Sequence, residues 1–199
     1  MVIRENSKVL EDPKLVRSCV NGDEAALETL YLRYNTIILN HLYRMVQDRT
    51  AAEDLTEETF FRVWRKAALY DEKKGSFKTW LFRMATRLAI NRLKKKARRD
   101  ERAQQLPLSG QEIADGSSSP VRAARESEAK EIVNRALQNL NEKDKAVLLL
   151  RHFEGLGEQD VARILGIPRG TVKSRTYYAV KRLKDALEGM GYTRNNTCR

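Results

Sequence analysis

The chain has 199 residues, which is enough for one ordinary domain or two small ones. Its formal net charge of +11 at pH 7 favours a polyanionic partner, either nucleic acid or an anionic membrane surface. The two cysteines, Cys19 and Cys198, lie near opposite ends without CxxC or Cys/His spacing, so we expect a reducing compartment and no zinc site. The longest aliphatic run, Ala146 to Leu150, is far shorter than the roughly 20 residues that span a bilayer. Residues 1–13 also have no continuous apolar segment of signal-peptide length, so we predict a cytoplasmic protein without membrane insertion.

An apolar stripe typical of an amphipathic helix runs from Leu27 to Met45, with spacings of three and four residues. Asp23 precedes this stripe as a candidate N-cap. We expect further helices over residues 51–69 and 76–99, and no segment has the sustained alternation of apolar and polar residues that predicts a strand.

The helix predicted over residues 51–69 has an acidic face opposite its apolar stripe. The residues on this face are spaced three or four apart: Asp54, Glu57, Glu58, Phe61 and Arg65. Carboxylates beside an exposed aromatic ring favour docking to a basic protein surface, because they repel phosphate. Two other interpretations stay open, a carboxylate metal site, which lacks a nearby histidine, and an ordinary solvated face.

The helix predicted over residues 76–99 has a dense run of positive charge. From Arg83 to Arg99 the sequence has basic residues and no acidic one, whereas a solvated helix face normally mixes the two signs. Phe77 and Trp80 lie just before this cationic track. Aromatic rings beside a cationic track suit single-stranded nucleic acid, whose bases stack or enter pockets while the phosphates follow the charge. Simple core packing is the alternative for these rings.

Helical periodicity lapses between residues 100 and 126, where Gly, Ser and Pro accumulate, and it resumes at Ile132. We therefore predict an all-α protein made of two small helical domains, residues 1–99 and 128–199. A flexible linker over residues 100–127 is expected to join them.

The C-terminal domain is expected to contain a helix-turn-helix. Ala162, Gly166 and Val172 supply the small contact residue, the turn glycine and the packing residue that such a unit needs. The second helix, predicted over residues 169–187, has six basic residues and no acidic one through Lys184. Because Arg pairs bidentately with guanine while Ser, Thr and Lys suit phosphates or base edges, we expect this helix to bind duplex DNA. A basic but purely structural helix pair is the alternative.

Three segments, in this order and flanking the predicted linker, resemble the extracytoplasmic-function (ECF) sigma factors of bacterial RNA polymerase. Their sequences are AEDLTEETFFRVWRKA, SFKTWLFRMATRLAINRLKKKARR and GIPRGTVKSRTYYAVKRLKDAL. The resemblance covers about residues 14–99 and 129–187. It implies a sigma region 2 domain, which binds core polymerase and the minus-10 element, and a sigma region 4 domain, which binds the minus-35 element.

The resemblance also implies roles for individual residues. Those implied to bind polymerase are Asp54, Glu57, Glu58, Phe60, Phe61 and Arg65. Those implied to open and read the minus-10 element are Phe77, Lys78, Thr79, Trp80, Arg83, Arg87, Asn91, Arg92, Lys94 and Lys95. Those implied to read the minus-35 element are Arg169, Thr171, Lys173, Ser174, Arg175, Tyr178 and Lys181.

The sequence departs from the family pattern at three positions. Glu57 stands where Gln is usual, which adds charge to the acidic face. Tyr178 and Val180 stand where many members have Arg, so the base contacts of typical members do not carry over.

The implied function is that of an alternative sigma factor, which directs core RNA polymerase to promoters and assists promoter melting. We expect no catalytic residue, cofactor or metal in the chain, because His41 and His152 lie far apart in sequence and no cysteines have metal spacing. An anti-sigma factor is a further partner that the resemblance implies. The alternative function is a free-standing helix-turn-helix transcriptional regulator, which leaves the acidic face and the cationic track unused.

Overall fold

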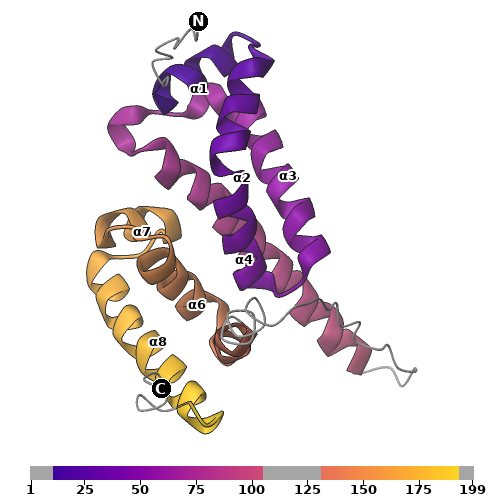
Figure 1. The fold of residues 1–199 in the computed structure, drawn as a ribbon, viewed down its shortest axis with the longest axis vertical. Coiled ribbons are helices and arrows are strands. Elements are labelled where there is room, and N and C mark those ends of the chain that lie inside the picture. The colour runs from indigo at the N-terminus through magenta and orange to yellow at the C-terminus, as the bar shows by residue number, and fades with distance from the viewer. Residues whose placement is uncertain (1–10, 105–130, 193–199) are drawn as a thin grey trace, which may run out of the picture.

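A computed structural model describes residues 11–104 and 131–192, and every regular element within those ranges is a helix (Figure 1). The elements of the N-terminal domain are α1 (Asp12–Val20), α2 (Glu24–Val46), α3 (Arg49–Lys66), the short 3-10 helices η1 (Ala67–Leu69) and η2 (Glu72–Lys74), and α4 (Phe77–Gln104). The C-terminal domain has helical residues 131–138, then α6 (Glu142–Leu148), the π-helix η3 (Leu149–Phe153), α7 (Glu158–Leu165) and α8 (Arg169–Gly189). The predicted all-α fold of two helical domains is confirmed.

Side-chain caps determine where α2 and α3 begin. The Asp23 carboxylate accepts a hydrogen bond of 3.2 Å from the amide of Ala26, and the Asp48 carboxylate accepts one of 2.9 Å from the amide of Ala51. Each cap satisfies one of the amides that have no partner in the first turn of a helix, and such a cap typically stabilises by about 1 kcal/mol. The N-cap predicted at Asp23 is confirmed.

Helix α1 lies outside the segments that were predicted as helical, and it is only 9 residues long. Pro13 stands in its first turn, where a missing amide hydrogen costs nothing. Asp12 accepts hydrogen bonds from Arg33 and Tyr34, which tie the start of α1 to α2. Its buried residues are Leu15, Val16 and Cys19.

The core of the N-terminal domain forms where α4 packs against α2 and α3 (Figure 1). Phe77 and Phe82 of α4 are almost completely buried, as are Leu30 and Ile38 of α2 and Val63 of α3. Because these side chains come from three helices, the core fixes which face of each helix remains exposed. The faces opposite the core carry the charged residues discussed below.

Helix α4 continues through Gln104, beyond the end at Arg99 that the sequence pattern predicts. Residues 100–104 therefore belong to a helix rather than to the predicted linker, because Asp, Glu, Arg, Ala and Gln extend a helix without apolar periodicity. In Figure 1 this end of α4 extends beyond the other helices of its domain. Residues 105–127 of the predicted linker lie outside the described residues. In the ranges that are described, no helix combines the length and apolarity needed to cross a membrane.

The predicted helix-turn-helix consists of α7, the turn at Gly166 and α8. Gly166 has a φ of 65°, in the left-handed region, and the amide of Ile167 donates a hydrogen bond of 3.2 Å to the carbonyl of Ala162. Val172 is completely buried between the two helices, and Ala162 is partly buried against the same core. The three positions thus have the structural roles expected of them.

The two domains pack against each other, mainly where α7 lies along α4 (Figure 1). Buried side chains of both domains form one continuous hydrophobic cluster. This contact was not predicted from the sequence, since a domain interface has no periodic signal of its own.

Replacing Gly166 with Ala should lower the free energy of unfolding by about 1–2 kcal/mol, because a side chain with a Cβ strains the left-handed backbone. No atom lies within 4 Å of the added Cβ, so the backbone strain is the only cost. The matched control is Gly170→Ala inside α8, where the space is equally open and the substitution should stabilise by up to about 1 kcal/mol. Urea denaturation followed by circular dichroism distinguishes the two, and equal effects would contradict the strain argument.

Candidate nucleic-acid and protein interfaces

The predicted acidic face of α3 is a solvent-exposed surface. Asp54, Glu57 and Arg65 are exposed, and the Phe61 ring is 54% exposed with the Arg65 guanidinium 5.6 Å from its centroid. Glu58 is half-buried and accepts a hydrogen bond of 2.6 Å from the Arg62 side chain. The face therefore presents carboxylates around an accessible aromatic ring, as the spacing predicts.

Phe60, which the family resemblance includes among the polymerase-binding residues, is only 4% exposed. Its ring packs edge-on against Tyr31 of α2, with the centroids 4.9 Å apart. Phe60 and Tyr31 form one wall of a groove of about 420 Å³ between α2 and α3. Glu24 and Glu28 of α2 also line this groove, which is therefore acidic and partly apolar.

The cationic track of α4 is exposed along one side of the helix. Its exposed predicted residues are Arg83, Arg87, Asn91, Arg92, Lys94 and Lys95. No acidic residue of the described chain forms an ion pair with them. The uncompensated charge is therefore available to an external polyanion.

The residues at the start of α4 are less accessible than the track that follows. Phe77 is 1% exposed and Thr79 is 5% exposed, whereas Lys78 and Trp80 are half-buried. The Phe77 ring packs against Tyr34, Tyr70 and Trp80, with centroids 5.3–6.1 Å apart. In this conformation Phe77 supports the orientation of Trp80 from within the core.

Ser76 and Thr79 fix the entry into α4. The amide of Thr79 donates a hydrogen bond of 3.2 Å to the Ser76 hydroxyl, and the two hydroxyls lie 2.9 Å apart. Beside them is a cavity of about 120 Å³ whose wall includes Trp80, Arg83 and, from the C-terminal domain, Arg163. The sequence pattern does not predict that the second domain contributes to this cavity.

Helix α8 presents five of the seven predicted DNA-reading side chains to solvent. They are Arg169, Lys173, Ser174, Tyr178 and Lys181, while Thr171 and Arg175 are half-buried. Tyr178 is 57% exposed, and the neighbouring Tyr177, which is not among the predicted DNA-reading residues, is 67% exposed. The adjacent tyrosines in a basic segment are a signal visible in the sequence, and their exposure makes Tyr177 a further candidate.

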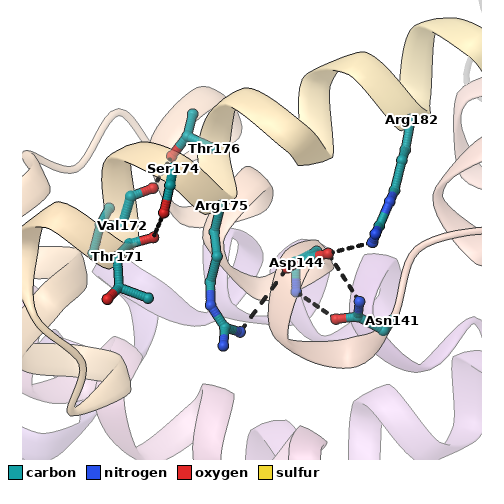
Figure 2. A network of polar contacts seen from close by, with 8 residues as sticks. All are labelled: Asn141, Asp144, Thr171, Val172, Ser174, Arg175, Thr176 and Arg182. Atoms are coloured by element: carbon teal, nitrogen blue, oxygen red, sulfur yellow. Dashed lines mark hydrogen bonds and ion pairs between the residues drawn. The ribbon is translucent and has the colours of Figure 1, made fainter.

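A buried carboxylate holds two of the α8 arginines (Figure 2). Asp144 of α6 is 8% exposed and accepts a hydrogen bond of 2.6 Å from Arg182, while Arg175 Nη1 lies 3.9 Å from its other oxygen. The Asn141 side chain also donates to Asp144 at 2.8 Å, and it caps α6 by accepting the Asp144 amide at 2.9 Å. Arg175 therefore connects α8 to α6 in addition to its predicted role at DNA.

Arg169, at the other end of the basic face, also has an acidic partner. Its Nε donates a hydrogen bond of 2.9 Å to Glu158 of α7, and this bond holds the pKa of the Glu158 carboxyl below its usual value. Lys173 and Lys181 have no ion-pair partner among the residues described. Some cations of the basic face of α8 thus form ion pairs with neighbouring helices, whereas Lys173 and Lys181 do not.

Comparison with known families and proteins matches both domains. The Sigma-70 region 2 family matches residues 30–99, and the Sigma-70 region 4 family matches residues 130–183. The RNA polymerase sigma-H factor of Pseudomonas aeruginosa is 33% identical over 89% of this chain and 94% of its own length. The ECF RNA polymerase sigma-E factor of Haemophilus influenzae is 30% identical over 90% of this chain and 96% of its own length. The chain belongs to the ECF group of the sigma-70 family. This membership confirms the prediction that the chain is not an enzyme, because sigma factors are transcription initiation factors.

Solved structures share the fold of this ECF sigma factor. CnrH, in complex with the cytosolic domain of CnrY, is 22% identical with a TM-score of 0.65, over 89% of this chain and 97% of CnrH. The sigma factor RpoE from Bartonella quintana, in complex with the anti-sigma factor NepR, is 20% identical with a TM-score of 0.63. That match covers 81% of this chain and 96% of RpoE.

Replacing Asp144 with Ala should destabilise this sigma factor by about 1–3 kcal/mol, because it removes a buried hydrogen-bonded carboxylate and leaves Arg182 and Asn141 without their acceptor. Thermal and urea denaturation measure the effect. The matched control is Glu188→Ala, whose partner Lys184 is exposed, so the loss should stay below about 0.5 kcal/mol. Equal losses in the two variants would show that Asp144 has no special role in holding α8.

Proposed function

We propose that this chain is an alternative sigma factor that binds core RNA polymerase, directs it to specific promoters and assists promoter melting. The observation that carries the proposal is the match of two sigma-70 regions, in order, to the two helical domains. The exposed surfaces agree with it, since an acidic face suits a basic protein partner and two cationic faces suit nucleic acid.

In this proposal the N-terminal domain, residues 1–99, has two partners. The exposed face around Asp54, Glu57 and Phe61 docks on core polymerase, with Phe60 supporting it from the core. Lys78, Trp80 and the cations that follow on α4 bind the melted minus-10 strand. Extruded bases stack or enter pockets while phosphates contact the exposed cations, so binding energy alone stabilises the open DNA.

The C-terminal domain, residues 128–199, binds the duplex minus-35 element through α8. Its unpaired cations Lys173 and Lys181 suit phosphates, and Tyr178 occupies an exposed position suited to base edges. The predicted linker, residues 100–127, joins the two domains, and α4 takes up its first residues as far as Gln104. Two weak DNA contacts on one polymerase then reinforce each other through effective concentration.

Two further features belong to the proposal. The partners imply a cytoplasmic location, where polymerase and promoter DNA meet. An anti-sigma factor is expected as a regulator, because RpoE of Bartonella quintana was solved with the anti-sigma factor NepR.

A free-standing helix-turn-helix regulator is the rival function. It accounts for α8 but leaves the acidic face of α3 and the unpaired cations of α4 without a partner. Such a regulator also does not need the N-terminal domain, which matches the Sigma-70 region 2 family.

Promoter-directed transcription with purified core polymerase separates these functions. Adding the full chain to core enzyme and genomic DNA should produce transcripts from defined starts that share two upstream elements. Core enzyme alone is the control and should give none of these starts. If several core enzymes with genomic templates produce no new start in the presence of the chain, the sigma-factor proposal is wrong.

The double variant Asp54→Lys with Glu57→Lys should bind core polymerase at least about tenfold more weakly, because both carboxylates lie on the exposed docking face. Binding of the variant to duplex minus-35 DNA should remain. The control is Glu131→Lys with Glu188→Lys, which makes the same change in net charge on exposed residues of the other domain. If both double variants lose polymerase binding equally, net charge rather than this face is responsible.

A further inference from the structure

The loop between η3 and α7 inserts an acidic side chain into the N-terminal domain. The Glu154 side chain is only 7% exposed, and its Oε1 lies 3.7 Å from His41 Nδ1 and 3.9 Å from Arg44 Nη1. Both partners belong to α2. A carboxylate buried between an imidazole and a guanidinium is a specific contact between domains rather than a solvated surface charge.

Two neighbouring contacts strengthen this docking point. The Lys78 ammonium donates a hydrogen bond of 3.0 Å to the backbone carbonyl of Glu154. The Arg44 guanidinium lies over the ring of Phe153, 4.8 Å from its centroid. One short segment of the C-terminal domain therefore contacts both α2 and α4 through its carboxylate, its carbonyl and its adjacent aromatic ring.

The docked domain also covers part of the proposed minus-10 surface. Lys78 is occupied by the Glu154 carbonyl, and Arg163 of α7 forms part of the wall of the cavity beside Trp80 and Arg83. Arg163 reaches close enough that its Nη1 would lie 3.6 Å from a Cβ placed on Gly75. A nucleotide base entering this cavity would meet side chains of the other domain.

We propose that Glu154 is an autoinhibitory latch, which holds the C-terminal domain on the N-terminal domain and masks the minus-10 surface until the domains separate. The contact that Glu154 makes between the two domains does not depend on promoter binding. Its regulatory meaning rests on the proposed function, in which Lys78 and Trp80 bind the melted strand.

The geometry of the latch favours a contact that opens readily. Glu154 Oε1 and His41 Nδ1 are both buried, and neither forms a hydrogen bond within the described residues. The other ring nitrogen of His41 lies 3.0 Å from the Thr86 hydroxyl, which fixes the ring but leaves Nδ1 facing the carboxylate. Buried polar atoms without hydrogen bonds are costly, so the closed form is held by attraction between charges and limited by incomplete hydrogen bonding.

Single charge reversals should open the full-length chain. Arg44→Glu places two carboxylates beside each other, which repel. Glu154→Lys places a third positive charge beside Arg44 and Lys78, which also repels. Each variant should have a larger radius of gyration than the wild-type chain in small-angle X-ray scattering. The double variant restores opposite charges and should return towards the wild-type value, which distinguishes a broken latch from general unfolding. Circular dichroism of each variant checks that the helices are retained.

Opening should also expose the minus-10 surface. The probe is a short, fluorescein-labelled single-stranded DNA of random sequence, titrated into each full-length protein. If the closed form outnumbers the open form about tenfold, opening should strengthen apparent binding by about tenfold. Arg44→Glu is the decisive variant, because it lowers the net charge and yet should bind the strand more tightly. Exposed control variants with the same charge changes are Arg49→Glu and Glu131→Lys.

The proposal is overturned if the wild-type chain and both single variants have the same radius of gyration. It is also overturned if Arg44→Glu binds the strand no more tightly than Arg49→Glu. Both measurements use the isolated protein, whereas failure of the proposed function appears as absent transcripts with core polymerase. The two failures are therefore distinguishable.

Discussion

Packing of α4 is the constraint on which the rest of the structure depends. One side of this helix supplies Phe77 and Phe82 to the core of the N-terminal domain, and the helix also contacts α7 of the C-terminal domain. Its remaining side carries the unpaired cations. The same helix thus orders the first domain, presents charge to solvent and supports the second domain, so a change in its orientation affects all three.

Many cations on one helix repel each other, and the two domains of this chain compensate that repulsion differently. In α8, acidic residues of neighbouring helices hold part of the positive charge, Asp144 at one end and Glu158 at the other. In α4, the described residues provide no such acids for the cations from Arg83 onward. Part of the positive charge of α8 is thus paired, and these ion pairs fix the orientation of the helix, which suits a rigid duplex. The cations of α4 remain unpaired, which suits a single strand that can adapt to the protein.

The helices that were predictable from the sequence are those whose buried positions repeat with helical spacing. The stripe from Leu27 to Met45 and its cap at Asp23 predict α2, and Gly166 predicts the helix-turn-helix turn, because each feature is local. The candidate surfaces were predictable as faces, since residues three or four apart share one side of a helix. The exposure of individual side chains within those faces was not predictable. Phe60 and Phe77 are buried because they pack against Tyr31 and Tyr34, which come from another helix.

Long-range contacts explain the rest of what the sequence pattern does not predict. Glu154 and Arg44 are ordinary charged residues in sequence, and only the packing of two domains turns them into a buried pair. Asp144 has a weak local signal, its spacing of three from the capping residue Asn141, but its partner Arg182 is 38 residues away. Interactions of this kind need the fold before they can be recognised, whatever the local pattern.

The latch and the proposed polymerase-binding face lie on different helices, which has a consequence for the order of events. No hydrogen bond or ion pair among the described residues joins the acidic face of α3 to the C-terminal domain. In the proposed function, core polymerase therefore docks on the closed chain through α3 while the surface around Lys78 and Trp80 remains covered. A partner shifts a conformational equilibrium only by its difference in affinity for the two states, so docking on α3 alone does not open the chain. Opening requires a contact that the closed form cannot make. Helix α8 is exposed in the closed chain, so its binding to duplex DNA alone does not open the chain either, whereas the surface around Lys78 and Trp80 becomes available only when the domains separate. In the proposed mechanism, the melted strand is therefore captured only after the second domain has moved off this surface.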